Sequence, residues 1–472
     1  MSGILWTAQE FAEALGGRVS GTVPGITGIS IDSRSLKPGE AFFAITGDRM
    51  DGHDFVRAAM DNGAGVAVIA EARASKIGRV RPVIVVPDVL EALRRLAAAA
   101  RARSDAKVIA VTGSVGKTST KEMLRLALSP AGEVHASVAS FNNHWGVPLS
   151  LARLPQSAQF AIFEIGMNHA GEITPLTKLV RPHVAMVMNV EAVHLEHFES
   201  VEAIADAKAE IFAGLEPDGF AVINGDSPYR DRLAAAAQAA QAADAQIVTF
   251  GTAPEAEGRL LMHSVLSDRT AVTASILGTD IAYSLGAPGR HLVQNSLAVL
   301  AAARLAGADV KAAAVALADF RPPAGRGQRH TLRVGTGRAL LLDESYNANP
   351  ASMRAAIELL GGSAVGTGRR IAVLGDMLEL GARSEDMHRE LASTLEEARI
   401  NLVFCAGPHM LALYDALPAY RRGGWALSSD DLQEKVLEEI RPGDVVMVKG
   451  SLGSRMGPIV TALLGRFAPA AA

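Results

Sequence analysis

Short apolar runs alternate with amphipathic stretches along most of this chain. In the middle of the chain, the apolar runs predict strands at 108–111, 160–165, 184–190 and 220–223, and segments with helical spacing lie between them. Such alternation is typical of a mainly parallel sheet with helices on both faces. The pattern therefore predicts an α/β fold for this part of the chain.

The same rhythm restarts after a break in pattern at Arg321-Pro-Pro-Ala-Gly325. Asn349 is a suitable N-cap for the first new helix, because proline is favoured in the first helical turn that follows it. The region 256–285 has little helical signal, and we expect a small antiparallel insertion there. Strands are expected at 339–342, 371–374, 401–405 and 445–448, with helices after Pro350, Ser384, Pro408 and Asp430.

The first hundred residues predict shorter elements. Thr7-Ala-Gln-Glu10 has the form of a capping box, and the helix that it starts should end at Gly16-Gly17. The 472 residues correspond to about three domains. We divide the chain into three α/β domains at 1–104, 105–328 and 329–472. The first domain should contain strands at 41–45, 65–69 and 83–86 and helices at 55–63 and 89–103.

Composition narrows the classes of function. The 46 basic and 50 acidic residues leave a formal charge of −4, so we expect no general attraction to nucleic acid or to an anionic membrane. Cys405 is the single cysteine, which excludes an intrachain disulfide and fits a reducing compartment. We see no apolar run long enough for a membrane helix and no basic-then-apolar leader. The chain is expected to be a cytoplasmic protein that does not insert into membranes.

A glycine-rich loop follows the first strand of the central region, in Thr112-Gly113-Ser114-Val115-Gly116-Lys117-Thr118-Ser119. Such a loop turns its N–H groups and the N-terminus of the next helix toward a phosphate. Lys117 would reach the β- and γ-phosphates of ATP, and the Thr118 hydroxyl would ligate Mg²⁺. Val111 stands where the general consensus has a further glycine, so the loop is a variant of the pattern. The alternative is an ordinary glycine turn between strand and helix.

Two later segments contain candidates for metal chemistry. Glu164 ends the apolar run 160–165, where ligands gather in open α/β sheets, and could hold Mg²⁺ opposite the phosphate loop. A loop-anchoring role fits its position equally well. His194 and His197 follow the next strand, but histidines in such places are more often structural than metal ligands.

Lys208 falls on the apolar stripe of the helix expected over 201–215, in line with Ile204 and Ile211. A lysine in this position either extends its ammonium outward to solvent or is desolvated, which lowers its pKa. A desolvated, neutral amine could take up CO₂ and become a carbamate that binds a metal. The sequence leaves both outcomes open.

These motifs are members of a longer ordered series. It comprises the phosphate loop at 112–118, Phe-Asn-Asn-His-Trp-Gly-Val-Pro at 141–148, Glu-Ile-Gly-Met-Asn at 164–168, His-Leu-Glu at 194–196, Ala-Lys-Ala-Glu-Ile at 207–211, Gly-Arg-His-Leu-Val-Gln-Asn at 289–295, Gly-Arg at 325–326, Asp-Glu-Ser-Tyr-Asn-Ala-Asn-Pro at 343–350, Leu-Gly-Asp-Met-Leu-Glu-Leu-Gly at 374–381 and Val-Lys-Gly-Ser at 448–451. With this series, essentially the whole chain resembles the Mur ligase family, the ATP-dependent amide-forming enzymes of peptidoglycan assembly.

The resemblance implies a small N-terminal UDP-binding α/β domain, a central P-loop domain with a mainly parallel sheet and a C-terminal Rossmann-like α/β domain. It is strongest to the branch that joins D-alanyl-D-alanine to UDP-N-acetylmuramoyl-tripeptide through an acyl phosphate. The segment 346–353, the run 374–381, Asp32-Ser-Arg34 and Asp51-Gly-His53 point to that branch. The Asp-Asn-Pro-Arg motif of the diaminopimelate- or lysine-adding members does not occur.

The resemblance also implies roles for individual residues. Glu164 and His194 match Mg²⁺ ligands, and Lys208 matches a lysine that is carbamoylated in several members; with Lys117 they form the expected catalytic set. The substrate contacts would be Ser33 and Arg34 in the UDP pocket, Asn142 and Asn143 beside the muramoyl-peptide carboxylate, and Tyr346, Asn347 and Asn349. ATP would be bound by residues 113–119, by Asn295 at the adenine, and by Arg326 and Asp343 at the ribose and phosphates.

Three departures from the family pattern accompany these matches: Ser114 replaces a frequent threonine, Glu344 a second aspartate, and Leu292-Val-Gln a stretch that commonly contains asparagine. We expect a working monomer in which the last domain rotates toward the centre when nucleotide binds. The sequence leaves open the third residue of the acceptor peptide and the base that deprotonates the amine. Other classes to be tested are a folylpolyglutamate synthase, a nucleotide-dependent switch or motor, and a non-enzymatic binding module.

Overall fold

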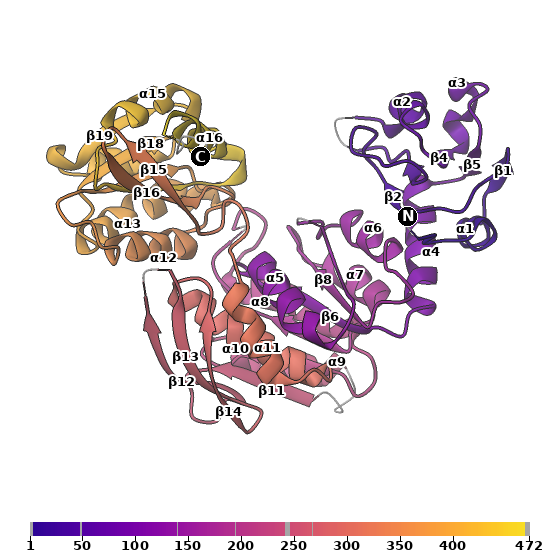
Figure 1. Ribbon diagram of the computed structural model, residues 1–472, viewed down its shortest axis with the longest axis horizontal. Helices are drawn as coiled ribbons and strands as arrows, with labels where there is room; N and C mark the ends of the chain where they lie inside the picture. Colours follow the sequence, from indigo (N-terminus) through magenta and orange to yellow (C-terminus); the bar gives the residue numbers. More distant parts are fainter. Residues whose placement is uncertain are drawn as a thin grey trace.

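The computed structural model describes residues 3–47, 50–138, 140–193, 195–240, 246–266 and 268–467. Three lobes follow one another along the chain, and each contains its own sheet. The first and last lobes stand apart at the two ends of the molecule, and the central lobe joins them below (Figure 1). This arrangement confirms the predicted α/β class with three sheets.

The N-terminal lobe contains a five-stranded sheet of order β1-β5-β4-β3-β2, parallel except for the antiparallel pair β1 and β5. The predicted capping box is present at α1, where the Thr7 hydroxyl accepts from Glu10 N–H and Glu10 in turn accepts from Thr7 N–H. The helix ends at Gly16, which has φ 62°. The elements are β1 (Arg18–Ser20), β2 (Ile29–Ser30), β3 (Ala41–Phe43), β4 (Val66–Ala70), β5 (Val83–Val86), α1 (Ala8–Leu15), α2 (Val56–Asp61), α3 (Ala74–Ile77) and α4 (Val89–Ala102).

One helix of the next lobe completes the core of the N-terminal lobe. Leu149 and Ala152 of α6 (Gly146–Ala152) belong to the same buried cluster as Trp6, which lies just before α1. The Trp6 indole N–H donates to the Ala152 carbonyl at 3.1 Å, and the Arg103 guanidinium lies 3.3 Å from the centre of the same ring. The first two lobes therefore share packed structure in addition to the chain that links them.

The central lobe is built on a nine-stranded sheet of order β14-β13-β12-β11-β10-β9-β6-β8-β7. Seven of its strands, from β12 to β7, pair in parallel, as the sequence pattern predicted. Its strands are β6 (Lys107–Thr112), β7 (Val134–Ala136), β8 (Phe160–Glu164), β9 (Val184–Val187), β10 (Phe220–Asn224) and β11 (Gln246–Gly251). Besides α6, its helices are α5 (Lys117–Leu128), α7 (Ile173–Val180), α8 (Val201–Ala209), α9 (Arg230–Ala240), α10 (Arg290–Leu305) and α11 (Val310–Ala316).

The antiparallel segment expected over 256–285 is also present. It consists of β12 (Gly258–Val265), β13 (Thr270–Ile276) and β14 (Thr279–Leu285), which pair in antiparallel succession. It is an extension of the central sheet and not a separate insertion, because Gly258 and Arg259 pair in parallel with the end of β11.

The C-terminal lobe has a six-stranded sheet of order β15-β16-β20-β17-β18-β19, parallel except for the antiparallel edge pair β15 and β16. The sequence analysis predicted β16 but neither of the strands at the two edges of this sheet, β15 and β19. Its strands are β15 (Gln328–Val334), β16 (Gly337–Glu344), β17 (Arg370–Gly375), β18 (Leu402–Ala406), β19 (Arg422–Ala426) and β20 (Val445–Lys449). Its helices are α12 (Pro350–Gly361), α13 (Ser384–Glu397), α14 (Met410–Ala416), α15 (Ser429–Glu439) and α16 (Gly457–Arg466).

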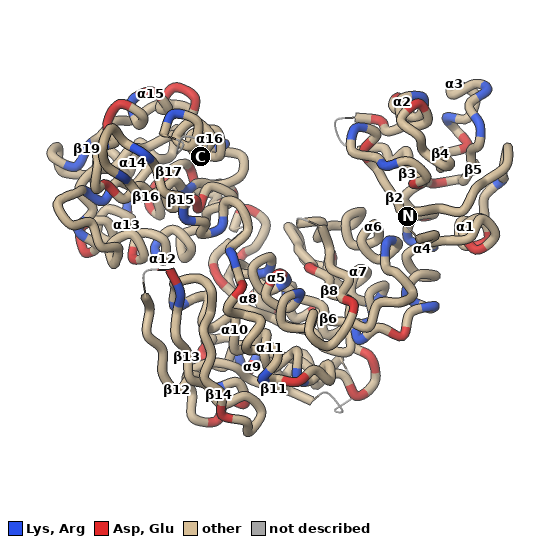
Figure 2. The backbone as a smooth tube through the Cα atoms, in the orientation of Figure 1, with Lys and Arg blue, Asp and Glu red and all other residues tan. Residues whose placement is uncertain are grey.

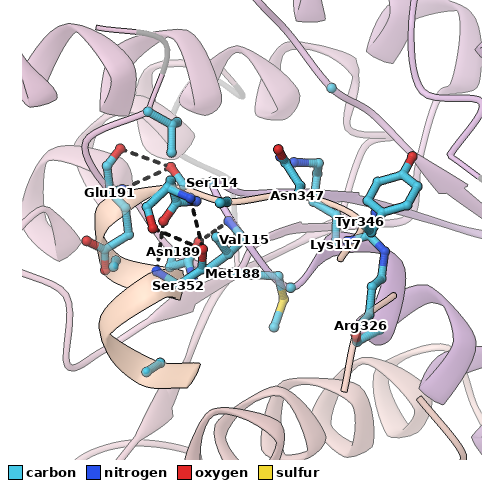
Figure 3. Close-up of a pocket in the computed structure, with 18 of the residues that line it drawn as sticks. Ser114, Val115, Lys117, Met188, Asn189, Glu191, Arg326, Tyr346, Asn347 and Ser352 are labelled. Atoms are coloured by element: carbon cyan, nitrogen blue, oxygen red, sulfur yellow. Dashed lines mark hydrogen bonds between the residues drawn. The ribbon is translucent and has the colours of Figure 1, made fainter. Parts of the chain in front are cut away.

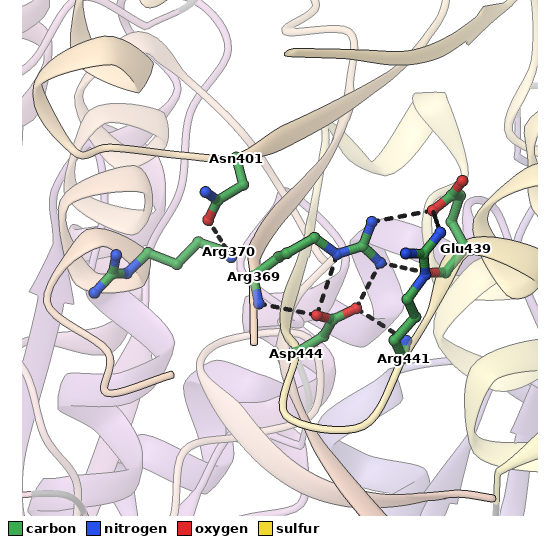
Figure 4. Close-up of polar contacts among 6 residues, drawn as sticks. All are labelled: Arg369, Arg370, Asn401, Glu439, Arg441 and Asp444. Carbon is green, nitrogen blue, oxygen red and sulfur yellow. Dashed lines mark hydrogen bonds and ion pairs between the residues drawn. The ribbon is translucent and has the colours of Figure 1, made fainter. Parts of the chain in front are cut away.

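A group of charged residues, which we call the clasp, fastens the beginnings of β17 and β20. The buried Asp444 carboxylate accepts from the backbone N–H groups of Arg369 and Arg441 at 2.9 Å each, and from the Arg369 Nη2 at 2.8 Å. Arg369 also donates to Glu439 at 3.1 Å (Figure 4). The clasp lies at the opposite end of β20 from Lys449, which pairs with Glu344 at the end of β16.

Basic and acidic residues are interspersed along the backbone of all three lobes (Figure 2). Within the ranges that the structure describes, no helix combines the length and apolar character needed to cross a bilayer.

Candidate functional site

A cavity of about 600 Å³ lies between the central and C-terminal lobes. The central lobe contributes the phosphate loop and the ends of β8 and β9, and the C-terminal lobe contributes the start of α12 and the segments around Leu378 and Lys449. Figure 3 shows Lys117, Arg326 and Tyr346 at one side of this cavity and Ser114, Asn189 and Glu191 at the other. The carboxyl ends of parallel strands meet here, which is where ligands bind in open α/β sheets.

The phosphate loop is held in shape by the segment that follows β9. Ser114 N–H and Val115 N–H donate to the backbone and side-chain oxygens of Asn189, at 3.1 and 2.9 Å. The Ser114 hydroxyl accepts from Glu191 N–H at 2.9 Å. Burial raises the pKa of Glu191. These contacts fix the conformation of the phosphate loop.

Gly116 is the N-cap of α5 and has φ 85°, a conformation that favours glycine. A Cβ at this position would lie 3.0 Å from the Asn295 amide nitrogen. Asn295 belongs to α10 and is 8% exposed, and it therefore packs directly over the loop. Both residues line the cavity.

Thr118, Glu164 and Asn142 form a hydrogen-bonded chain beside the loop. The Thr118 hydroxyl donates to Glu164 Oε2 at 2.9 Å, and the Asn142 amide donates to Oε1 at 2.8 Å. Glu164 is 1% exposed and ends β8. The carboxylate thus holds the side chains of Thr118 and Asn142 in place, and its role as a Mg²⁺ ligand stays a prediction.

Lys117 lies over the loop, where its ammonium donates to the Gly113 carbonyl at 2.7 Å. Burial lowers the pKa of Lys117; Glu164 opposes this shift and Arg326 adds to it. An ammonium that is desolvated but only partly neutralised attracts an anion strongly.

Lys208 in α8 is 2% exposed, so its ammonium does not extend outward to solvent. Burial first, and then the nearby Lys117, hold the pKa of Lys208 well below its usual range. Among the described residues, Lys117 is the one charge that acts on it, and it has the same sign. A lowered pKa increases the neutral fraction of the amine, which is the form that carbamate formation requires.

The segment around Arg326 is fastened to the C-terminal lobe. Asp343 accepts from Gly325 N–H at 2.9 Å through its carboxylate and from Gly327 N–H at 2.8 Å through its carbonyl. The Arg326 guanidinium lies 4.0 Å from the centre of the Tyr346 ring and donates to Ser140 of the central lobe at 3.3 Å. Arg326 is therefore fastened to the C-terminal lobe and reaches into the central one.

The cavity wall on the C-terminal side includes Asn347 and Asn349, as well as Lys449. Asn349 is the N-cap of α12, as predicted, and Pro350 follows it in the first helical turn. Lys449 is 3% exposed, donates to the Asn347 carbonyl at 3.0 Å and lies 3.7 Å from Glu344; burial lowers its pKa.

Several predicted residues lie off the cavity wall. The Asp343 carboxylate is 5% exposed and is occupied by Gly325 and Ser345, so it lies behind the loop. Asn143 caps α6 through Gly146 N–H at 2.9 Å. Ser33 and Arg34 lie in the N-terminal lobe, where Arg34 is exposed and pairs with Asp32. His194 falls outside the described residues.

Comparison with known proteins matches three successive family models. Residues 25–101 match "Mur ligase family, catalytic domain", residues 111–303 match "Mur ligase middle domain" and residues 326–452 match "Mur ligase, glutamate ligase domain". The UDP-N-acetylmuramoyl-tripeptide–D-alanyl-D-alanine ligase of Rickettsia prowazekii is 32% identical over 97% of this chain and 99% of its own length. The chain belongs to the Mur ligase family.

Further relatives agree with this assignment. The Escherichia coli ligase of the same name is 34% identical, over 97% of this Mur ligase and 98% of its own length. The crystal structure of MurF from Acinetobacter baumannii superposes with a TM-score of 0.83 at 29% identity, covering 98% and 99% of the two chains. MurF from Thermotoga maritima, solved in complex with ADP, superposes with a TM-score of 0.77 at 26% identity, covering 93% and 97%. A folylpolyglutamate synthase from Mycobacterium tuberculosis, at 16% identity, shares the fold alone.

The residues present fit a nucleotide with Mg²⁺. Oxygen ligands are what Mg²⁺ prefers, and Thr118 and Glu164 place a hydroxyl and a carboxylate together next to the phosphate loop. A carbamate on Lys208 would add a further anionic oxygen donor near Lys117.

The sequence analysis assigned no role to Ser140, His291, Glu344 or Lys449, which also line the cavity. Glu344 and Lys449 had a signal, because each ends an apolar strand at the carboxyl edge of the sheet, as Glu164 does. Burial lowers the pKa of His291, which lies one helical turn before Asn295. No pattern in the sequence distinguishes Ser140.

Proposed function

We propose that this Mur ligase joins D-alanyl-D-alanine to the terminal carboxylate of UDP-N-acetylmuramoyl-tripeptide at the expense of ATP, with Mg²⁺ in the site. The substrates are supported by relatives of that name at 32–34% identity that match 97% of the chain. ATP use is supported by the ADP complex of a structural neighbour. The observation that carries the chemistry is the buried, incompletely neutralised pair of lysines beside the phosphate loop.

The first step activates the acid. An oxygen of the tripeptide carboxylate attacks the γ-phosphorus of ATP, the bond to the β,γ-bridging oxygen breaks, and ADP and an acyl phosphate form. The main electrostatic requirement is to offset the repulsion between the tripeptide carboxylate and the ATP γ-phosphate. Lys117 is placed to offset that charge from the loop, and Arg326 from the C-terminal side.

Thr118, Glu164, His194 and a carbamate on Lys208 are the proposed metal ligands. Mg²⁺ bound there would neutralise phosphate charge and polarise the phosphoryl oxygens. The carbamate forms when the neutral Lys208 amine attacks CO₂ and releases one proton. The low pKa of this buried amine supports the assignment.

In the second step the free amine of D-alanyl-D-alanine attacks the acyl carbon, phosphate leaves, and the amine loses a proton. Asn295 and Arg326 are proposed to contact ATP, and Asn142, Tyr346, Asn347 and Asn349 the other substrates. All six line the cavity, which supports the assignment. Asp343 and Asn143 are proposed to act by holding Gly325 and α6 in place.

The three lobes are proposed as domains with boundaries at 1–104, 105–328 and 329–472. Each range contains one sheet, except that β15 starts one residue before the last boundary. Ser33 and Arg34 would belong to a UDP pocket in the first domain. Because the first and last lobes stand apart (Figure 1), the substrates meet only if the lobes approach one another. Small-angle scattering should show smaller dimensions with an ATP analogue and the UDP substrate, and equal dimensions would contradict closure of a working monomer.

The proposal is tested by measuring phosphate release from the purified full chain with ATP, Mg²⁺, UDP-N-acetylmuramoyl-tripeptide and D-alanyl-D-alanine, omitting one component at a time. We expect full release only with the complete mixture, together with stoichiometric pentapeptide product. Release at the full rate without the peptide acid would overturn the proposal and indicate a switch or motor. Lys107→Ala, at the exposed start of β6, is the matched control for Lys117→Ala, and it should retain activity.

A further inference from the structure

Lys121 is a fully buried lysine that the mechanism above does not use. It lies in α5, one helical turn after Lys117, and its exposed fraction is 0%. Its ammonium donates to the Ser137 carbonyl at 2.6 Å and lies 3.2 Å from Glu122 Oε1. Removing an ammonium from water costs free energy unless it is paired and hydrogen-bonded. The contacts of Lys121 with Ser137 and Glu122 offset this desolvation.

The segment that begins at Ser137, to which Lys121 donates, continues to the candidate metal site. Ser137 follows β7 and is 3% exposed, and its N–H donates to the Ile162 carbonyl of β8 at 3.2 Å. A few residues later, the Ser140 hydroxyl lies 3.4 Å from the Thr118 hydroxyl and accepts from Arg326 at 3.3 Å.

Asn142 is the second residue between β7 and α6 that contacts the candidate metal site. Its amide donates to Glu164 at 2.8 Å, and its carbonyl accepts from Gly166 N–H at 2.8 Å. The connection between β7 and α6 is therefore fixed at its start by Lys121, while Ser140 and Asn142 contact the two proposed metal ligands Thr118 and Glu164.

We propose that Lys121 is a positioning residue of the metal site. It ties the start of the β7–α6 connection to the same helix that carries Thr118, and so fixes the distance between Ser140 and the Thr118 hydroxyl. Groups that orient metal ligands through hydrogen bonds affect metal affinity strongly. This inference rests on the proposed function, because it takes Thr118 and Glu164 as the Mg²⁺ site.

The test replaces Lys121 by methionine, which has a similar unbranched length and lacks the ammonium. The matched control is Arg101→Met, at the end of α4 in the N-terminal lobe. Arg101 is also a buried cation, 6% exposed, and donates to the Val180 and Arg181 carbonyls at 2.9 Å each, away from the cavity. The measurement is calorimetric ADP affinity at a series of Mg²⁺ concentrations, together with the melting temperature.

We expect both variants to lower the melting temperature. Lys121→Met alone should raise the Mg²⁺ concentration for half-maximal ADP binding, by about tenfold, without changing ADP affinity in the absence of Mg²⁺. In turnover assays kcat should fall while KM for D-alanyl-D-alanine stays unchanged. An equal Mg²⁺ dependence in Lys121→Met and Arg101→Met would overturn the inference, because Lys121 would then be a purely structural residue.

Ser140→Ala keeps the test decisive if Lys121→Met does not fold. Ser140 is only half-buried, so this variant should fold. The inference requires it to raise the Mg²⁺ requirement in the same direction, and a wild-type requirement would contradict it. A folded wild type that shows this Mg²⁺ linkage but no ligase activity would contradict the proposed function instead, and the two failures are thus distinguishable.

Discussion

Two of the buried charged groups in the described part of the chain are built in opposite ways. In the clasp of the C-terminal lobe, the Asp444 carboxylate faces two arginine N–H groups and the Arg369 guanidinium, and Glu439 accepts from the same arginine. In the site of the central lobe, Lys117 and Lys208 lie together with Glu164, whose two oxygens accept from the neutral groups of Thr118 and Asn142.

The clasp stabilises the fold, whereas the charges of the site are arranged to bind an anion. The clasp is balanced within the protein, so it stabilises the start of the sheet and needs nothing further. The two lysines of the site repel one another and are desolvated, which costs stability until an anion arrives. A buried cluster of charges is therefore informative about function when its members are left unbalanced.

The largest effect is expected for Lys117→Met. Loss of the cation that faces the phosphates should reduce kcat by about 10³-fold or more. The free energy of unfolding should stay the same or rise, because a desolvated charge is removed. The measurements are phosphate release and urea denaturation. A variant that is inactive because it has lost stability would break the comparison between the two groups.

Lys208→Ala should come next, with kcat lower by roughly 10²-fold. If the carbamate is the active form, short-chain carboxylates added to the assay should restore part of the activity, because they can occupy the space and supply the anionic oxygens. The same compounds should not restore Lys117→Met. Absence of any rescue at high acetate or formate would remove support for the carbamate, as would an unmodified Lys208 in the mass of the native protein.

Asp444→Ala should show the reverse pattern of effects. Breaking the clasp leaves Arg369 without its buried partner, and we expect a loss of about 2–3 kcal/mol in the free energy of unfolding, since Arg369 is partly exposed. Asp444→Asn should lose less. The kcat of the folded fraction should equal that of wild type. A fall in kcat at full folding would show that the clasp also serves the site.

The smallest effect concerns Cys405 in β18. Burial raises the pKa of this thiol well above its usual range, and the nearby Asp376 adds to the shift. The thiolate is the reactive form, so the native protein should hardly react with a thiol reagent at pH 8. Asp444→Ala should be labelled faster, because the free energy of local opening of the sheet is lower. Lys117→Met should be labelled at the wild-type rate. Equal rates in all three proteins would show that the clasp does not hold this sheet closed.

Much of the fold could be predicted because periodicity and local signals agree. The apolar runs of β6, β8, β10, β17 and β20 were each placed within about a residue or two, and the caps at Thr7 and Asn349 were placed at the residue. The edge strand β19 was missed because Arg422-Gly-Gly-Trp-Ala426 has two glycines and no alternation. Its strand conformation comes from pairing with β18 and not from local propensity.

The candidate site was predictable where a motif fixes the local backbone. The phosphate loop and Glu164 lie where the pattern of strand followed by helix requires. The burial of Lys208 could not be decided, because the outcome depends on whether the space around its ammonium is filled by other segments. The structural role of Asp343 was not visible either, since its partner Gly325 N–H comes from another segment of the chain.

The shared packing of Trp6, Leu149 and Ala152 has a practical consequence for engineering. The first lobe cannot be exchanged by cutting the chain near residue 104. A fragment that starts there would expose the apolar side of α6, and a transplanted first lobe would lack the α6 residues that complete its core. A functional chimera between relatives must carry residues 146–152 from the same parent as the first lobe. Recombination points that ignore this will give insoluble protein even when every catalytic residue is retained.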